Sequence, residues 1–307
     1  MGQIKKFDNK FKEETMSNIK KQNGLKKTGP HALLALIFFL VQVNSAWSFA
    51  NKKGFTVHVD ITTEALTQGS IPGLLLEFSE TAIDQINSAN VDADNGSLFH
   101  FKPQHFDDEF LTQGSLYVKG LKRTIILLLT KKNSNGEVIP QGAAARGVLG
   151  RALHAIQDYY SHTNWVELGK TQINDNLGRD FIEPAPGGQT CIAPDSEDLI
   201  SGLEEITSGY WRGFAGCDDI PDVLKCRHGD PTGILCGGIN KDTFLKEGFN
   251  QAKTLAIEAT RDYVGQTVFE ILGSTELTID EKNKALRALL DKPETFKCTE
   301  ECMPPYI

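Results

Sequence analysis

The chain has 307 residues, with 40 acidic and 32 basic side chains and a formal net charge of −8. An acidic balance of this size disfavours long-range attraction to nucleic acid and to anionic lipid, although a dication held by the protein can still bind an anionic substrate. The length suffices for one large domain with a substantial core.

Residues 1–50 are predicted to be a secretory signal peptide with an extended basic n-region. Eight lysines lie before residue 29, and an apolar run over 32–41 leads into small residues, which is the order of segments in such signals. The run is short for a membrane span, so an uncleaved anchor is the less favoured alternative. Cleavage after Ala50 fits the small-residue rule, whereas cleavage after Ala46 would make Trp47 the new amino terminus. The sequence therefore predicts a secreted protein, extracellular or periplasmic.

Helical periodicity dominates the rest of the chain, so we expect an all-α fold in a single domain over residues 51–292, with 293–307 as a tail. No alternating strand pattern of useful length and no internal repeat are present. Helices are predicted over 58–88 with a break at 71–73, and over 107–130, 143–168, 195–208, 242–272 and 279–290. Long irregular segments are predicted over 169–189 and 209–240.

All six cysteines lie in the C-terminal part of the chain. They are Cys191, Cys217, Cys226, Cys236, Cys298 and Cys302. An even count behind a signal peptide favours disulfides, and six cysteines allow fifteen pairings among which the sequence does not choose. A zinc–thiolate knuckle on the three cysteines of 209–240 is the alternative.

The most informative motif is the spacing of His154, Asp158 and His162 in the predicted helix over 143–168. Four residues advance a helix by about 40° in azimuth, so the three side chains fall within an arc of about 80° on one face. Two imidazoles and a carboxylate on one side are typical of a first-row metal site, zinc above all. A buried hydrogen-bond network among the same three groups is the alternative.

Three more histidines lie beside carboxylates, two at predicted helix starts and one in the cysteine-containing segment 209–240, and a bundle could bring them to one end. They are His58 with Asp60, His105 with Asp107 and Asp108, and His228 with Asp230. We expect His58, His105, Asp107 and His228 to complete the metal site. A cap or surface role is the alternative for each, with Asp107 or Asp108 as an N-cap. His100 is expected to be a surface residue.

The segment from His154 to Gly169 resembles the signature of the Het-C family and of the N-terminal region of von Willebrand factor A domain-containing protein 7. Short motifs at 58–62, 105–107, 225–229 and 237–242 fit the same group in order, so the resemblance covers most of 55–272. The group is distantly similar to zinc-dependent phospholipase C and the P1/S1 nucleases. That similarity implies a helical bundle of the phospholipase C/P1 nuclease type, with one to three zinc ions.

By this analogy the zinc ligands would be His58, His105, Asp107, His154, Asp158, His162 and His228. Two departures stand out. The enzymes carry a histidine and an acid four residues apart on their last ligand helix, whereas 242–272 holds no histidine and offers only Glu247 and Glu258. The enzymes also ligate zinc with an N-terminal tryptophan, which here requires cleavage after Ala46.

These observations predict a secreted zinc-dependent hydrolase, phospholipase C-like, acting on a phosphoester. The acidic charge favours a phospholipid at a membrane surface over nucleic acid as substrate. Asp107 or Asp60 would orient the attacking water as a general base. Of Tyr159, Tyr160 and Trp165, at least two are expected in the core and the other along a substrate cleft. The alternative is a non-enzymatic binding or toxin-like module that retains the scaffold and a structural metal.

Overall fold

A computed structural model describes residues 57–67, 76–95, 101–193, 198–212, 216–220 and 224–298. The predicted leader with both cleavage points, His100 and Cys302 lie outside the described residues. The described part holds seven α-helices, one short 3-10 helix and isolated β-bridges, and no sheet. The predicted all-α class is therefore confirmed. Over the same residues, no helix combines the length and the hydropathy that crossing a bilayer requires.

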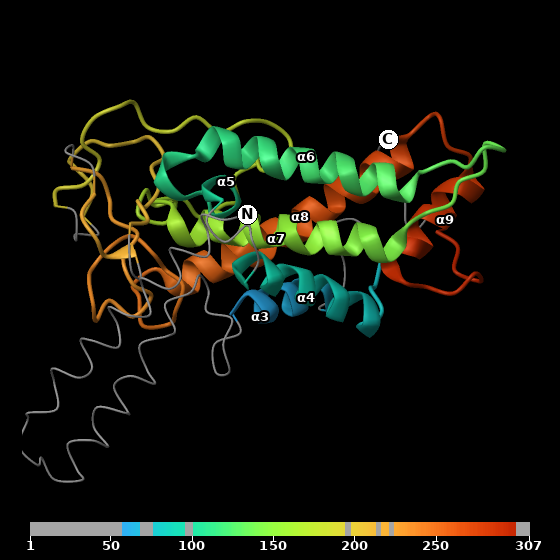
Figure 1. Cartoon of the computed structure of the whole chain (residues 1–307), viewed down its shortest axis with the longest axis horizontal. Coiled ribbons are helices and arrows are strands. Elements are labelled where there is room, and N and C mark those ends of the chain that lie inside the picture. The colour runs from blue at the N-terminus through green and yellow to red at the C-terminus, as the bar shows by residue number, and fades with distance from the viewer. Residues whose placement is uncertain are drawn as a thin grey trace, which may run out of the picture. The chain divides into compact units, whose positions relative to one another are not determined.

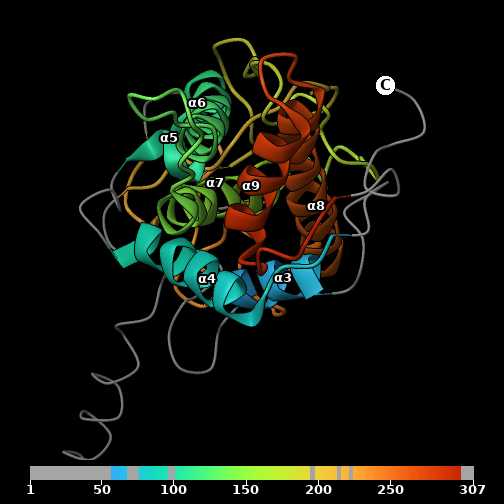
Figure 2. The same cartoon turned by 90° about the vertical axis from the view of Figure 1, so that its right-hand side faces the viewer.

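Helix α7 (Gly142–His162) lies in the middle of the bundle. Around it pack α4 (Glu80–Asn95), α6 (Leu111–Leu129) and α8 (Phe249–Gly273), as Figure 2 shows end-on. The bundle is completed by α3 (Val57–Thr67), α5 (Lys102–His105) and α9 (Ile279–Leu290). Every side chain of α7 from Ala152 to His162 is buried. The polar groups of this stretch must therefore find partners inside the protein.

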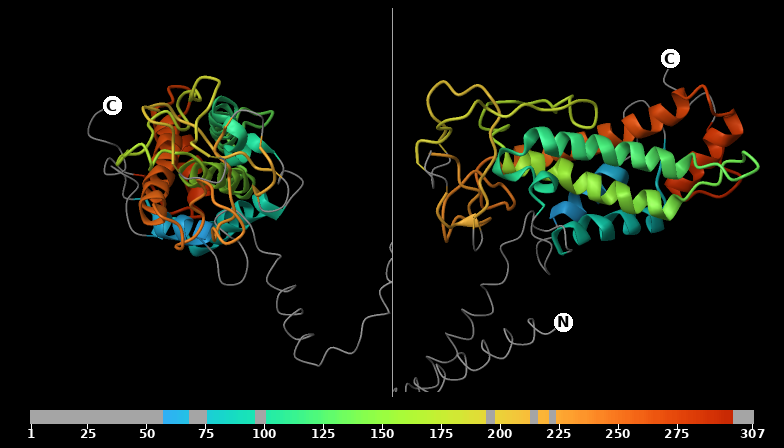
Figure 3. Two further views of the ribbon diagram at one scale, coloured as in Figure 1. Left: turned by 90° about the vertical axis from the view of Figure 1, so that its left-hand side faces the viewer. Right: turned by 45° about the horizontal axis from the view of Figure 1, so that its top comes forward.

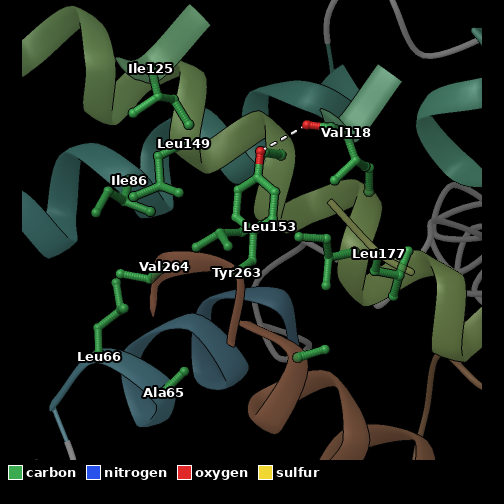
Figure 4. Packing of buried hydrophobic residues seen from close by; sticks show 14 of the residues in the cluster. Ala65, Leu66, Ile86, Val118, Ile125, Leu149, Leu153, Leu177, Tyr263 and Val264 are labelled. Carbon is green, nitrogen blue, oxygen red and sulfur yellow. Dashed lines mark hydrogen bonds between the residues drawn. The ribbon is translucent and has the colours of Figure 1, made fainter. Parts of the chain in front are cut away.

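The core fills the space between α7 and its neighbours with branched aliphatic side chains (Figure 4). Tyr263 of α8 is buried among them and donates a hydrogen bond from its hydroxyl to the Val118 carbonyl, at 2.9 Å. Gly150 sets the distance between α7 and α4, because a Cβ there would lie 2.3 Å from the Ile86 carbonyl oxygen. This close approach brings the last turns of α4 against the middle of α7.

Several predicted helix boundaries are wrong, and each error has a local cause. Helix α7 ends at His162, not at 168, because Thr163 is extended and pairs with Ser208 in a β-bridge. Helix α6 begins at Leu111, not at 107. Phe106, Asp108 and Glu109 have positive φ, so the chain before the helix forms only the short 3-10 turn η1 (Asp107–Glu109).

The helix predicted over 242–272 begins only at Phe249, after Gly248 with φ 77°. The helix predicted over 195–208 is absent from the described residues 198–208. The break predicted at 71–73 lies outside the described residues; α3 ends at Thr67 before it, and α4 continues to Asn95. The last helix, 279–290, is confirmed at both ends.

The irregular segments gather at one end of the bundle, where α7 ends and α8 begins (Figures 1 and 3). We call the described residues of 209–248 the cysteine loop. Two disulfides fix this end, Cys191–Cys226 and Cys217–Cys236. They rule out the alternative of a zinc–thiolate knuckle on these cysteines. Disulfides of this kind are typical of proteins in oxidising compartments.

Candidate metal centre

The centre is built on the C-terminal half of α7. His154, Asp158 and His162 are each at most 1 % exposed and face the same side of the helix. The Nε2 atom of His154 lies 3.1 Å from Oδ2 of Asp158. The structure thus brings together the three side chains whose spacing suggested a metal site.

A first cluster forms where α3, α4 and α5 meet α7. The His58 Nε2 atom lies 3.2 Å from Asp158 Oδ1, and the His105 Nδ1 atom lies 2.7 Å from Asp158 Oδ2. Asp94 at the end of α4 approaches the His154 Nε2 atom to 3.3 Å. His58 and His154 also stack, with ring centroids 4.4 Å apart. Three imidazoles and two carboxylates therefore converge within one small volume.

A second cluster forms around His162, at the end of α7. Asp107 of η1 lies 3.1 Å from the His162 Nδ1 atom, and Asp242 of the cysteine loop lies 3.2 Å from its Nε2 atom. The His228 Nε2 atom is 3.8 Å from the same Asp107 oxygen. The positive φ of Phe106 turns the chain sharply between His105 and Asp107, so that one contributes to each cluster.

Asp158 connects the two clusters. It belongs to a group with His58 and His154 and to another with His162 and Asp242, and in each group the candidate ligand atoms lie within 4.8 Å of one another. A carboxylate can bridge two cations, and two-metal hydrolytic sites hold their ions about 3.5–4 Å apart. The donor arrangement therefore fits two dications better than one.

Neighbouring polar groups set the orientation of the histidine rings. The His58 Nδ1 atom lies 2.6 Å from Oε1 of Gln157, and that of His154 lies 3.1 Å from Oδ1 of Asn90. Since an amide oxygen only accepts, both Nδ1 atoms donate, and in a neutral ring Nε2 then carries the lone pair toward Asp158. His228 likewise donates from Nδ1 to the Gly229 carbonyl, at 2.8 Å. Such fixing of tautomer and ring direction is common behind metal ligands.

The electrostatics of the centre are those of a buried, strongly acidic site. Burial would raise the pKa of Asp158, but His154 and His162 hold it well below its usual range. Burial would lower the pKa of His154, and the carboxylates of Asp158 and Asp94 instead raise it to about 10. Burial and the neighbouring His162 lower the pKa of His228 to about 4. Without a metal, the carboxylates therefore draw protons onto adjacent imidazoles.

Three buried atoms of the second cluster make no hydrogen bond to any described residue. They are Oδ1 of Asp107, Oδ2 of Asp242 and Nε2 of His228. Buried polar atoms that make no hydrogen bond are costly, and those on an ionised group cost most. All three are ordinary ligand atoms for a first-row dication. The residues present thus fit a metal.

The acids around the centre are already balanced by other groups. Asp108 accepts a hydrogen bond from the backbone N–H of Trp211, at 2.8 Å, and pairs with the guanidinium of Arg212. Asp230 accepts from the backbone N–H groups of Leu235 and Cys236, at 2.7 and 3.1 Å. Among the described residues of the centre, the four carboxylates of the two clusters instead pair with imidazoles.

The structure places the other predicted site residues differently. Asp60 is exposed, because two residues along a helix point to opposite sides and His58 takes the buried one. Glu247 and Glu258 are also exposed, so neither substitutes for the missing histidine of the last ligand helix. Sequence reasoning missed Asp94 and Asp242. Asp94 lies one helical turn beyond Asn90, and Asp242 closes the motif at 237–242, which are the signals that could have found them.

Of the three aromatic residues near the motif, two lie in the core as predicted. Tyr159 and Tyr160 are fully buried core residues whose hydroxyls accept hydrogen bonds from Asn174, at 2.7 and 2.9 Å. Trp165 is half-buried and donates to the Gln172 carbonyl, at 2.9 Å. Trp211 also contacts the centre, because the centroid of its ring lies 4.5 Å from that of His228.

Comparison with known proteins places the chain in a family. The sequence model of the VWA7 N-terminal domain family matches residues 62–277. Human von Willebrand factor A domain-containing protein 7 is 28 % identical over 76 % of this chain and 30 % of its own length. The rat protein of that name is 34 % identical over 53 % of this chain and 18 % of its own. The chain thus spans less than a third of these curated relatives.

No solved structure matches the chain. The family match includes every residue of the two clusters except His58, which lies before residue 62, where the match begins. The relatives' names state no activity, substrate or cofactor for the shared region. The match over most of the described helices nonetheless establishes kinship, and the chain belongs to the VWA7 N-terminal domain family.

Proposed function

We propose that this domain is an exported zinc-dependent hydrolase that holds two zinc ions and acts on a phosphoester, with a phospholipid favoured over nucleic acid. The observation that carries the proposal is the position of Asp158 between two clusters of ligand atoms. Nine candidate donors are available, of which four are carboxylates (Asp94, Asp107, Asp158 and Asp242) and five are imidazoles (His58, His105, His154, His162 and His228).

Charge supports a count of two. With all five imidazoles neutral, the four carboxylates leave four negative charges inside the protein, and two dications balance them. One dication would leave two buried negative charges uncompensated, which is strongly unfavourable in a low-dielectric interior. The mixture of imidazole and carboxylate donors favours zinc among the first-row metals.

Two zinc ions bound here would supply Lewis-acid polarisation of a phosphoryl oxygen and a water acidic enough to attack at neutral pH. The chain's own residues would do the rest. Asp107 is the acid placed to take the proton of the attacking water, because it retains 5 % exposure, more than the other three carboxylates of the two clusters. Asp60 is exposed, so it has no part in this role. Asn90 and Gln157 accept hydrogen bonds from the Nδ1 atoms of His154 and His58 and so fix the orientation of these rings.

The helical bundle, the central motif of α7 and the acidic and histidine ligands also support a distant relationship to the Het-C family, phospholipase C and the P1/S1 nucleases. The missing histidine of the last ligand helix is compensated by Asp242, which approaches His162 from the cysteine loop. The two disulfides agree with export through an oxidising compartment.

One observation favours the non-enzymatic alternative, a binding module with a structural metal. None of the nine donors is more than 5 % exposed, and structural zinc sites are closed. A structural zinc uses four protein ligands, however, whereas this centre assembles nine donors. The number of donors therefore favours the hydrolase.

The test is hydrolysis of a chromogenic phosphorylcholine ester by the zinc-loaded protein. We expect turnover that a chelator abolishes and added zinc restores. Asp107→Asn should lose turnover, while Asp108→Asn, a matched change at a residue paired with Arg212, should retain it. A protein that binds two zinc ions but turns over neither this ester nor a nucleic-acid phosphodiester would contradict the hydrolase and favour the binding module.

A further inference from the structure

Two turns of the cysteine loop expose large apolar side chains beside the metal centre. The first turn, 231–236, follows His228 and carries Ile234 and Leu235, which are 80 % and 59 % exposed. The second turn, 243–247, follows Asp242 and carries Phe244 and Leu245, which are 69 % and 54 % exposed. We call these four residues the apolar tip. A hydrogen bond of 2.7 Å from the Thr243 hydroxyl to the Pro231 carbonyl joins the two turns.

No exposed charge lies between the four residues of the apolar tip, and the exposed Glu247 follows them at the end of the second turn. Residues 231–246 contain three charged side chains, Lys241, Asp242 and Lys246, and each is at most 9 % exposed. The Lys246 ammonium donates to the Gly238 carbonyl at 3.1 Å, and that of Lys241 pairs with Glu167 at 2.8 Å. Single exposed apolar residues are ordinary on protein surfaces, but four together without an interspersed charge indicate a binding surface.

The tip is held outward by its own framework. The Asp230 carboxylate accepts from the backbone of Leu235 and Cys236, and Cys236 is tied to Cys217. The chain on either side of the first turn is paired, because the Asn240 N–H donates to the His228 carbonyl, at 3.1 Å. Because these bonds fix the turns before any partner binds, little conformational entropy is lost when the tip is covered.

We propose that the apolar tip inserts into the interface of a zwitterionic phospholipid bilayer, an inference that rests on the proposed function. The charge pattern selects this surface: a chain of net charge −8 is repelled by anionic lipid, and an uncharged tip needs no counter-charge. The tip adjoins His228 and Asp242 in the chain. Insertion therefore sets the metal centre beside the headgroup layer, where the phosphoester bonds of phospholipids lie.

Sedimentation with phosphatidylcholine vesicles tests the proposal on the full zinc-loaded chain. We compare the native protein with Phe244→Ser/Leu245→Ser and with Leu127→Ser. Leu127 is the matched control, because it is also 69 % exposed but belongs to the last turn of α6, at the opposite end of the helices from the cysteine loop (Figure 1). The three proteins share all their other residues, so vesicle binding by the rest of the chain contributes equally to each.

We expect the native protein and the control to bind alike, and the double variant to bind at least about tenfold more weakly, since burying one Leu or Phe side chain is worth at least that factor. Binding should persist at high salt. Equal binding of all three proteins, binding that requires anionic lipid and disappears with salt, or loss of self-association in place of vesicle binding would each overturn the proposal.

The same variants separate this proposal from the proposed function. The double variant should hydrolyse the soluble phosphorylcholine ester as the native protein does, and lose activity only on vesicles. If the native protein hydrolyses the ester but does not bind vesicles, only the proposed membrane insertion of the apolar tip is refuted. If vesicle binding depends on the apolar tip but no ester is hydrolysed, the membrane insertion is supported and the proposed hydrolase function is refuted.

Discussion

Removal of the metal should make the stability of the protein fall between about pH 7 and pH 9. Burial alone would lower the pKa of His154, but Asp158 and Asp94 raise it from 6.5 to about 10 in the metal-free protein. A histidine whose pKa is raised on folding contributes stability that is complete below the unfolded value and is lost as the pH rises through the folded value. Throughout this window the folded chain therefore holds a proton that the unfolded chain has released.

The size of the effect follows from linkage. One extra proton in the folded state changes the free energy of unfolding by about 1.4 kcal/mol per pH unit, which amounts to about 2.5 kcal/mol for His154 over this window. His162 adds to the fall, because although burial would lower its pKa, Asp158, Asp242 and Asp107 raise it well above 6.5. With zinc bound, the ligating imidazoles carry no such proton, so stability should stay level or rise with pH.

Urea unfolding at both ends of the window, with stoichiometric zinc or with a chelator, measures this difference. His154→Asn in chelator should show a smaller fall than the native protein. Equal pH dependence with zinc and with chelator would refute the reasoning, as would stability that rises with pH after the metal is removed.

Three further predictions concern the parts of the centre. His228→Ala should lower the bound zinc from two ions to one, measured by elemental analysis, because His228 belongs only to the cluster around His162; loss of both ions would contradict the division into two clusters. Removing the second disulfide by Cys217→Ser/Cys236→Ser should weaken binding of one zinc ion in a competition titration and leave the other unchanged, since the disulfide holds only the cysteine loop. Gly150→Ala should lower thermal stability by about 1–3 kcal/mol, because its Cβ would lie 2.3 Å from a backbone carbonyl oxygen of α4, whereas Gly147→Ala, with no such neighbour within 4 Å, should be neutral or slightly stabilising.

The sequence predicts best what local spacing decides. His154, Asp158 and His162 share a face because the helical repeat dictates it, and their burial follows from the apolar residues of α7. The end of α7 could not be predicted in this way. The apolar spacing continues through Trp165 and Val166, and only the distant pairing of Thr163 with Ser208 stops the helix.

Long-range partners account for the other omissions. Asp94 looks like one of several acids near the end of a polar helix, and only the packing of α4 on α7 brings it to His154. Asp242 looks like the first residue of a helix, yet the chain remains irregular for six residues and carries this carboxylate to His162. The disulfide pairing is equally non-local, because spacing alone does not choose among fifteen connectivities.

The central claim is that Asp158 joins two metal sites. The ratio of zinc to protein in the purified chain, measured by elemental analysis after zinc loading and removal of unbound metal, tests it most directly. We predict two zinc ions per chain in the native protein and none in Asp158→Ala. A ratio of one or less in the native protein, or an unchanged ratio in the variant, would contradict the account.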